Sequence, residues 1–434
     1  MDQMISSSAG MLRTNLRGQI RQTPLPKWKA LLPLFEAVMN SFQAIHDSKA
    51  EHQHKITISV EREDGLLEED YPPIVGFTIT DTGVGFDDDN FDSFNTAFSE
   101  HKVDRGGKGL GRFMWLKAFD TVDISSVFST HDPEEERELW NRSFKFDVNY
   151  DPEKAAPVKI KQGVVGTTIK LGGFKKVYRE HCPLQVEKLA QRLAEHFILV
   201  LMQAKCPRVE IHDQGVKTSL NTVFRENFKD NSATSSFALQ GRNFTINGFR
   251  LSSRGASKHR LIYAANSRGV ITEMLDQYIP NLSSRLIDED GESFVYLAVV
   301  QGDYLNEKVN NFRTDFEIQD TVGDELELEL EDVDIKRSEI RNECTTFIEN
   351  DLSSLIDDLN RVKIEKLKSY VHVDAPQYKP LMRYVIDFVG EISPNATKME
   401  MELALHKELH KREVSLKRES KRILTQGAKL DDYE

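Results

Sequence analysis

The sequence predicts an α+β protein with two or three domains. The chain has 434 residues, which is longer than a usual single domain, since domains commonly hold about 100 to 200 residues. Stretches with helical spacing of apolar residues occur beside stretches that alternate with a period of two, which predicts helices and strands in the same domains. Hydrophobic residues make up 39% and charged residues 29% of the chain, a composition typical of globular rather than disordered or membrane proteins.

The first long segment, Lys27 to Lys49, predicts one helix, because its apolar residues recur at helical spacings and it contains no glycine. Two antiparallel strands are expected next, from Lys55 and from Pro73, the second ending at Asp81. Residues 82–107 are rich in Gly, Asp, Asn and Ser, and we expect a long lid-like excursion without an element of its own. A short buried helix over 110–120 and strands near residues 122, 143, 158 and 166 follow.

A helical segment over 183–202 is expected to close this region. Strands resume near residues 208, 236, 243, 260 and 293, and a further alternation begins at Asp324. Beyond residue 336 we expect helices over 351–370 and 396–424, the latter with a weak seven-residue repeat of apolar residues. The domains expected are an N-terminal arm over 1–26, a first domain over 27–205, a smaller α+β domain over 206–335 and a helical C-terminal region over 336–434.

The charge balance excludes some classes of partner. A net charge of -13 disfavours adhesion of the whole surface to nucleic acid or anionic lipid. A local nucleic-acid-binding groove near the N-terminal arginines stays open, beside the alternative of a solvated basic arm. No segment approaches a run of about 20 apolar residues, and the N-terminus lacks an apolar secretory stretch, so a cytoplasmic protein without membrane contact is expected. The three cysteines are far apart and show no paired spacing for zinc.

The first segment with candidate chemistry is the helix over 27–49. Glu36, Asn40 and Ala44 are spaced by four residues, so they share one helix face. A carboxylate there can act as general base, and the Asn carbonyl oxygen suits a magnesium ion that keeps waters and phosphates. Solvated surface residues are the alternative for each of them taken alone.

Three further segments carry polar groups or glycines. Asp81-Thr82-Gly83-Val84-Gly85 ends a strand, where a carboxylate can accept a hydrogen bond from an exocyclic amine and glycines allow close approach of a flat ring. Gly106 to Gly111 is a glycine-rich turn before a helix, which offers N–H groups to phosphates, with Lys108 and Arg112 as nearby cations. It lacks the ending of a Walker A loop. Gly166-Thr167 opens a strand and places a hydroxyl there.

In this order, the four segments resemble the GHKL ATPase superfamily, which includes gyrase B subunits, MutL, heat-shock chaperone ATPases, MORC proteins and sensor histidine kinases. The match covers about residues 31–171. The resemblance implies a Bergerat-fold α/β sandwich that binds ATP and Mg²⁺ between the first helix and a lid, followed by a transducer-like domain.

The resemblance also implies a role for each matching residue. Glu36 would be the general base and Asn40 the magnesium ligand, while Asp81 would accept from the adenine amine. Gly83 and Gly85 would line the base, and Thr167 would support Asp81. The phosphates would be surrounded by Gly106, Lys108, Gly109, Leu110 and Gly111.

The branch of the superfamily follows from two further observations. Sensor kinases usually carry Asn where Glu36 stands, and no histidine precedes the helix, so hydrolysis is favoured over phosphotransfer. Clamp-type branches send a basic residue from a second domain to the terminal phosphate, and Arg313 or Lys308 is expected here, with an ordinary surface role as the alternative.

The expected function is therefore that of an ATP hydrolase whose nucleotide-bound state closes a homodimer. It would act as a clamp or conformational switch on a nucleic-acid or protein client. The alternative is a weakly hydrolysing, nucleotide-gated interaction subunit that controls a separate effector. Many GHKL proteins occur in bacterial defence operons, and this association suggests an anti-phage role.

Overall fold

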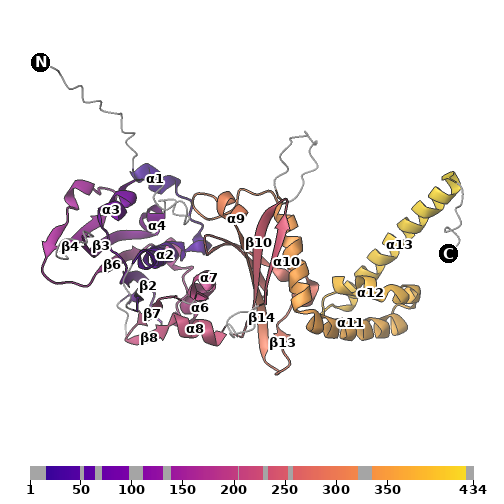
Figure 1. The fold of residues 1–434 in the computed structure, drawn as a ribbon. Helices are drawn as coiled ribbons and strands as arrows, with labels where there is room; N and C mark the ends of the chain where they lie inside the picture. Colours follow the sequence, from indigo (N-terminus) through magenta and orange to yellow (C-terminus); the bar gives the residue numbers. More distant parts are fainter. Residues whose placement is uncertain are drawn as a thin grey trace, which may run out of the picture. The chain divides into compact units, whose positions relative to one another are not determined.

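A computed structural model of the chain describes residues 16–48, 53–63, 71–96, 111–130, 138–203, 205–227, 233–252, 258–320 and 335–426. The chain forms two compact units (Figure 1). The first extends to Glu226 and includes two later segments, Ala264–Ile271 and Leu305–Glu317. The second holds the segments Asn227–Tyr263 and Thr272–Tyr304 and the chain from Ile318 onward. Both contain helices and strands, so the predicted α+β class is confirmed.

Eight strands form the sheet of the first unit in the order β5-β4-β3-β6-β2-β1-β7-β8. Their bounds are β1 Lys55–Arg62, β2 Ile74–Asp81, β3 Phe119–Ser129, β4 Leu139–Phe146, β5 Val158–Ile160, β6 Gly166–Phe174, β7 Arg208–Asp213 and β8 Val216–Ser219. Neighbouring strands are antiparallel except β1 and β7, which are parallel. Because β7 pairs with β1, the first unit extends past the boundary that we expected after residue 205.

The register of this sheet separates an apolar face from a polar one. Ile58, Ile79, Ile169 and Ile124 lie in one row across four strands and are buried. The next row is polar, and the hydroxyls of Thr80 and Thr168 meet at 3.1 Å on its exposed side. One residue further along, the apolar face ends in Asp81, Thr167 and Ser126, all buried. Strand alternation thus brings three polar groups to the helix-covered side of the sheet.

Helix α2, Leu32–His46, packs on β1 and β2. It is shorter than the predicted helix over 27–49, because Pro33 lies in its first turn and proline favours the start of a helix over its interior. The first residues of the segment predicted as helix instead form a 3-10 turn over Lys27–Lys29. The other helices of this unit are α1 Leu16–Gln22, α3 Asp88–Asn95, α4 Gly111–Ala118, α5 Lys176–Arg179, α6 Val186–His196, α7 Ile198–Leu201 and α8 Leu220–Asn227, which ends one residue past the unit.

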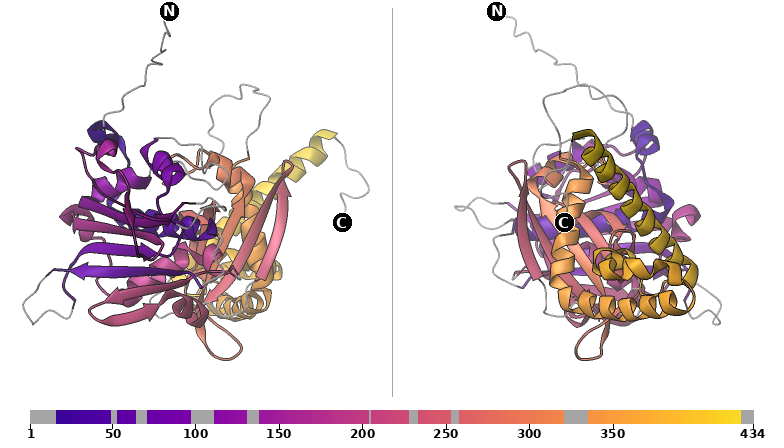
Figure 2. Two further views of the ribbon diagram at one scale, coloured as in Figure 1. Left: turned by 60° about the vertical axis from the view of Figure 1, so that its left-hand side comes forward. Right: turned by 90° about the vertical axis from the view of Figure 1, so that its right-hand side faces the viewer.

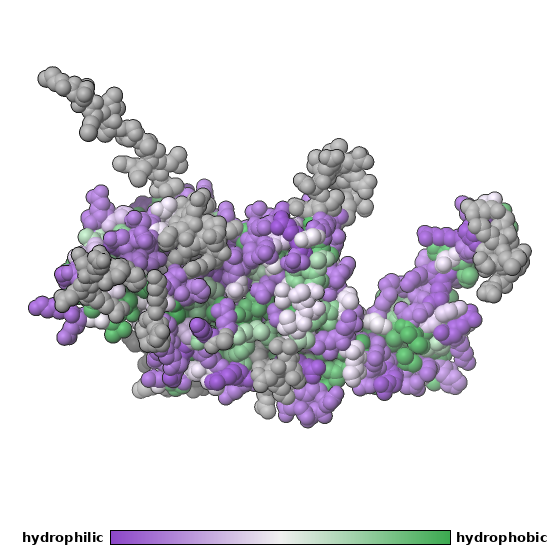
Figure 3. Space-filling view, viewed as in Figure 1, coloured by the Kyte–Doolittle hydropathy of each residue, from purple (hydrophilic) through white to green (hydrophobic). Residues whose placement is uncertain are grey.

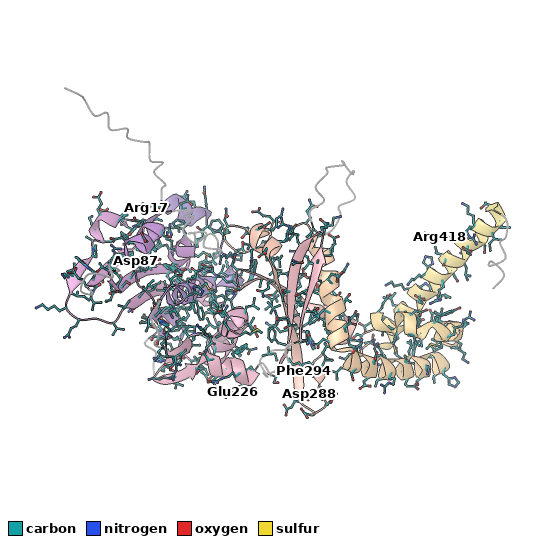
Figure 4. The ribbon with its side chains drawn as sticks, viewed as in Figure 1. Arg17, Asp87, Glu226, Asp288, Phe294 and Arg418 are labelled. Atoms are coloured by element: carbon teal, nitrogen blue, oxygen red, sulfur yellow. The ribbon has the colours of Figure 1, made fainter. Side chains whose placement is uncertain are left out.

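Helix α3 corrects the expectation that residues 82–107 hold no element. Asp87, labelled in Figure 4, caps the helix by accepting from the backbone N–H of Asn90 at 2.8 Å. Acidic residues in its first turn suit the positive end of the helix dipole. Its Phe91 and Phe94 pack against Phe144 of β4. The acidic residues that suggested a loop therefore lie at the N-terminus of a helix and stabilise its start.

The second unit contains a sheet in the order β12-β11-β14-β10-β9, with β13 beside β14. The bounds are β9 Ala233–Leu239, β10 Arg242–Leu251, β11 Arg260–Ala265, β12 Arg268–Met274, β13 Leu286–Ile287 and β14 Ser293–Gly302, and α9 Asp303–Lys308 follows β14. The segment Ala264–Ile271, which holds the end of β11, the turn after it and the start of β12, is called here the β11–β12 link, and it belongs to the first unit, as does Leu305–Glu317. The strand-like alternation from Asp324 lies outside the described residues.

The C-terminal helical region has an apolar core of side chains between Leu367 and Leu405, while its first helix contacts β9 and β14. It consists of α10 Arg337–Asp351, α11 Ser353–Val373, a 3-10 segment Pro376–Tyr384, α12 Val385–Phe388 and α13 Lys398–Gln426 (Figure 2). The far half of α13, where Figure 4 labels Arg418, has a largely hydrophilic surface (Figure 3). Leu416 of the seven-residue repeat is 68% exposed. Among the described helices, none is both long and apolar enough to cross a membrane.

Candidate functional site

A pocket in the first unit gathers residues that are distant in sequence. It is lined from α2, the segment after β2, α4, the start of β6, the β11–β12 link and the segment after α9. Eight of the predicted site residues line it: Glu36, Asn40, Asp81, Gly85, Gly111, Arg112, Thr167 and Arg313. Gly106, Lys108, Gly109 and Leu110 lie outside the described residues. The pocket therefore unites residues from all four predicted segments with a basic residue from a later part of the chain.

Asp81 is the buried carboxylate of this pocket. One of its oxygens accepts from the backbone N–H of Gly83 at 2.9 Å and from that of Thr167 at 3.3 Å, and the other accepts from the Ser41 hydroxyl at 2.8 Å. Burial raises the pKa of Asp81 to about 6, although these three donors act in the opposite direction. The oxygen that contacts Ser41 keeps a further lone pair, so Asp81 can accept one more hydrogen bond from a ligand.

The segment after Asp81 is held against helix α2. The backbone N–H of Val84 donates to the carbonyl of Ala44 at 3.1 Å, so the small residue of the helix motif does admit a close neighbour. Gly85 has a φ of 81°, in the left-handed region that side chains disfavour. A Cβ at Gly85 would also lie 2.5 Å from the carbonyl oxygen of Val127. A side chain at this position would therefore displace the wall of the pocket.

Thr167 supports Asp81 through its backbone. Its hydroxyl lies 3.0 Å from that of Ser126, a residue of β3 that also donates to the Gly166 carbonyl at 3.0 Å. Ser126 in turn accepts from the backbone N–H of Phe86 at 2.9 Å. The expected contact between Thr167 and Asp81 is thus made by an N–H group, and the two hydroxyls fix the neighbouring loop.

Glu36 lies at the other end of the pocket in an ion pair. Its side chain is 13% exposed, and Oε1 accepts from Nη1 of Arg268 at 2.7 Å. Burial raises the pKa of Glu36, but the charges of Arg268 and Arg313 outweigh it and hold that pKa below its ordinary value. A Cβ at Gly111, the first residue of α4, would lie 2.6 Å from Oε2 of Glu36. A side chain at Gly111 would therefore require the Glu36 carboxylate to shift.

Arg313 is the second cation near Glu36. It is 6% exposed and has a φ of 53°, which is uncommon for a residue with a side chain. Burial lowers its pKa to about 9. Its Nη1 is buried and has no hydrogen-bond partner among the described residues, and the same is true of Nε of Arg268. Buried donors of this kind are costly unless a ligand satisfies them.

The segment that carries Arg313 is tightly built. Asn310 accepts from the backbone N–H of Thr314 at 2.9 Å and donates to its hydroxyl at 3.0 Å, and its carbonyl accepts from the N–H of Arg313 at 3.0 Å. Lys29, just before α2, donates to the carbonyls of Thr314 at 2.8 Å and Val270 at 3.1 Å. One lysine therefore joins the Arg313 segment to the β11–β12 link that carries Arg268.

The predicted residues Asn40, Lys308 and Arg112 differ in their surroundings. Asn40 is exposed and lines the pocket one turn after Glu36, as the helix spacing predicts. Lys308 does not line the pocket. It is the last residue of α9, five residues before Arg313, and its carbonyl accepts from the N–H of Glu317 at 2.7 Å. Arg112, expected as a phosphate cation, packs on the rings of Phe94 and Phe113 and donates to the carbonyl of Thr96 at 3.0 Å.

Sequence reasoning missed Arg268, Ser41 and Ser126. Ser41 follows Asn40 in α2 and points to the sheet, so helical spacing could have placed it near Asp81. Arg268 follows a hairpin turn in which Asn266 and Ser267 both have positive φ, a geometry that Asn favours. Nothing local to that turn indicates a partner 232 residues away.

Comparisons with known proteins add little to this geometry. No protein-family model matches the chain. No curated protein matches it either. Among solved structures, the chain is similar to one described as "Crystal Structure of N terminal domain of a DNA repair protein", with 12% sequence identity and a TM-score of 0.37 over 67% of this chain and 87% of that chain.

Proposed function

We propose that this protein binds and hydrolyses ATP in the pocket around Asp81, Glu36 and Arg313, and that its first unit is a Bergerat-fold ATPase of the GHKL type. The observation that carries the proposal is the convergence of the four predicted segments on one pocket. Each segment alone has an ordinary structural explanation. Chance does not readily bring a buried carboxylate with a spare lone pair, a helical Glu and Asn, and a buried Arg to the same cavity.

The two ends of the pocket suit the two ends of a nucleotide. Asp81 offers an acceptor beside closely approaching backbone, which suits the exocyclic amine of adenine. At the other end, two buried guanidiniums face one carboxylate, and both have an unsatisfied N–H group. This net positive charge in a buried site suits a phosphate group.

Glu36 is the proposed general base. An ionised carboxylate takes a proton from water as the water oxygen attacks the terminal phosphorus, and the bond to the bridging oxygen breaks to leave ADP and phosphate. The lowered pKa of Glu36 keeps it ionised at neutral pH. Asn40, on the same face one turn later, fits a magnesium ion that is held mainly by phosphates and water. That ion would neutralise phosphate charge when bound.

The proposed nucleotide is tested by calorimetric titration with Mg-ATP and Mg-GTP, together with an assay of phosphate release. We expect ATP to bind and to be hydrolysed, and GTP to bind far more weakly. Adenine presents an amine that donates a hydrogen bond to Asp81, and guanine presents a carbonyl at that position, which cannot donate. Equal binding of the two nucleotides would contradict the role of Asp81. Absence of binding by either would remove the proposed function.

The alternative, a nucleotide-gated subunit with little hydrolysis, is favoured by one observation. Glu36 accepts a hydrogen bond from Arg268 at 2.7 Å, and this bond occupies Oε1 of the proposed base. A base in this state is masked. In both versions the nucleotide would control an ATP-dependent homodimer. The dimer would act on a client or effector protein or on nucleic acid. A role of this dimer in anti-phage defence is also proposed. Phosphate release slower than one turnover per hour would favour the alternative.

A further inference from the structure

We propose that Arg268 exchanges partners during the nucleotide cycle: it holds Glu36 in the empty pocket and leaves it for the terminal phosphate when a triphosphate binds. This inference rests on the ATPase function proposed above and adds to it a control of the base. Binding of the diphosphate would leave the ion pair intact, so Glu36 would become available to water only beside a complete triphosphate.

The ion pair is the first observation that supports exchange. Nη1 of Arg268 and Oε1 of Glu36 are 2.7 Å apart, and both side chains are nearly buried, with exposures of 4% and 13%. A carboxylate that accepts a charge-assisted hydrogen bond this short is a weaker base toward water than a free one. The ion pair therefore keeps Glu36 ionised but engages one of its oxygens.

The second observation is that Arg268 is incompletely satisfied in this state. Its Nε is buried without a hydrogen-bond partner among the described residues, and Nη1 of Arg313 shares that condition. The pair thus leaves two buried donors without acceptors, which is costly. A phosphate group placed between the two guanidiniums would supply acceptors for both, because Arg binds phosphate through several N–H groups at once.

The charged groups near Arg268 make Glu36 and a bound terminal phosphate the two anions that would compete for it. Arg313 is the other charge that acts strongly on Glu36. His196 stacks on Phe35 of α2, and burial together with Arg268, Arg313 and Lys29 lowers its pKa to about 3, so it is neutral. Lys29 donates to backbone carbonyls. A carboxylate with a single charge therefore competes for Arg268 with a terminal phosphate of higher charge.

The backbone on both sides of Arg268 is held by hydrogen bonds, so the side chain can change partner without local unfolding of the backbone. It follows the tight β11–β12 turn, whose Asn266 N–H donates to the side chain of Asn306 at 2.7 Å. Lys29 fixes the next part of the link through Val270. With the backbone held at both ends, exchange requires only rotation of the long Arg268 side chain.

Structures of the wild-type protein with Mg-ADP and with Mg-ADP-beryllium fluoride test the exchange. With ADP, we expect the bond between Arg268 and Glu36 to remain near 2.7 Å. With the triphosphate mimic, we expect Arg268 to contact the fluoride group and the bond to Glu36 to be broken. A bond that persists beside the bound mimic would overturn the exchange alone. A pocket that takes up neither nucleotide would overturn the ATPase function and the exchange with it.

A double-mutant cycle gives an independent test in solution. The affinities of ADP and of a non-hydrolysable ATP analogue are measured by calorimetry for wild type, Glu36→Gln, Arg268→Gln and the double variant, at pH 8.5 to keep Glu36 ionised. If the pair is broken on binding, Glu36→Gln tightens the analogue by about tenfold more in the presence of Arg268 than in its absence. Simple repulsion between Glu36 and phosphate gives an equal or larger gain without Arg268, and that result would overturn the proposal.

Lys29→Gln is the matched control of this cycle. It removes a cation that ties the same two segments together without contacting Glu36. We expect it to change the affinities for ADP and for the analogue by the same factor. A selective loss of the analogue in Lys29→Gln would mean that segment position, rather than partner exchange, sets the preference for the triphosphate, and would count against the proposal.

Discussion

Asp81 combines burial with hydrogen bonds that a neutral amide can also form. We predict that Asp81→Asn abolishes measurable ATP binding in calorimetry, because loss of a charge-assisted bond costs roughly 1.5 to 3 kcal/mol and the new NH₂ group can face the adenine amine. Gly83 and Thr167 can still donate to the Asn oxygen, and Ser41 can accept from its nitrogen. Unchanged ATP affinity would contradict the adenine site.

The same substitution has an expected effect on stability. The pKa of Asp81 rises from 3.8 to about 6 on folding, so its stabilising contribution is full below pH 3.8 and is lost as the pH rises through 6. At neutral pH the ionised group costs the ligand-free protein about 2 to 3 kcal/mol. Asp81→Asn should therefore be at least as stable as wild type at pH 7.5 in urea unfolding. A less stable variant would show that the charge is compensated in the folded state.

Glu36 and Asn40 separate chemistry from binding. We predict that Glu36→Gln keeps or increases ATP affinity while turnover falls by about 10² to 10⁴, as usual for loss of a general base. The amide is preferable to Ala, because it keeps a partner for Arg268. Asn40→Ala should reduce both affinity and turnover, since the proposed magnesium ligand is lost. Calorimetric titration measures the affinity and phosphate release under saturating ATP measures the turnover of both variants, and wild-type turnover in Glu36→Gln would exclude the base.

At this scale the sequence reveals local patterns better than distant partners. The spacing of Glu36 and Asn40 and the strand end at Asp81 could be predicted, because helix and strand periods fix them. Arg268 could not, because its role depends on a contact with a residue 232 positions earlier. Arg313 was distinguished from Lys308 only by the fold of the segment that carries them.

Helix α3 and the residues just before it contact a buried cation, Arg142. Arg142 of β4 donates to the carbonyls of Phe86 and Asp87 at 2.9 and 3.1 Å and stacks on the ring of Phe91 at 4.0 Å. We predict that Arg142→Met speeds hydrogen exchange in α3 and weakens ATP binding, because Asn90 of α3 donates to the carbonyl of Gly85 at the pocket. Mass spectrometry measures the exchange.

Lys145→Met is the control for this helix. Lys145 lies on the same strand, but its side chain is 54% exposed and its ion pair with Asp147 is long, at 3.9 Å. Exchange in α3 should be unchanged in this variant. Equal effects of Arg142→Met and Lys145→Met would mean that β4 as a whole, rather than the cation, holds the helix.

The failure to predict α3 has a physical cause. Its eight residues contain three Asp and two Asn, which are weak helix formers in isolation. The helix is stabilised by the Asp87 cap and by contacts with β4 about 50 residues later. The strands were predicted more closely, because alternation within each strand reflects its two faces directly.

For the whole molecule, we predict an ATP-dependent dimer that hydrolysis reopens. Glu36→Gln with saturating Mg-ATP should accumulate as a dimer in multi-angle light scattering, while wild type with ADP should be monomeric. Asp81→Asn, which lacks the adenine contact, should stay monomeric with ATP and serves as the control. A Glu36→Gln protein that binds ATP and remains monomeric would remove the clamp and leave the pocket unaffected.

The overall class was predictable, but the extent of the first unit was not. Composition and mixed periodicity indicated α+β correctly. Pairing of β1 with β7 joins residues 55 and 208, and such a long-range pairing leaves no trace in either strand. The strand at residue 208 therefore looked like the start of the next domain.

The late position of Arg268 in the chain has a consequence for the newborn protein. A ribosome adds about 5 to 20 residues per second, so the 232 residues from Glu36 to Arg268 take on the order of 10 to 50 s to synthesise. Strands β1 to β8 are all translated within that interval. Each nascent chain thus completes these strands while Glu36 still lacks its cation, and the site acquires its final charge balance only after Arg268 and Arg313 have been synthesised.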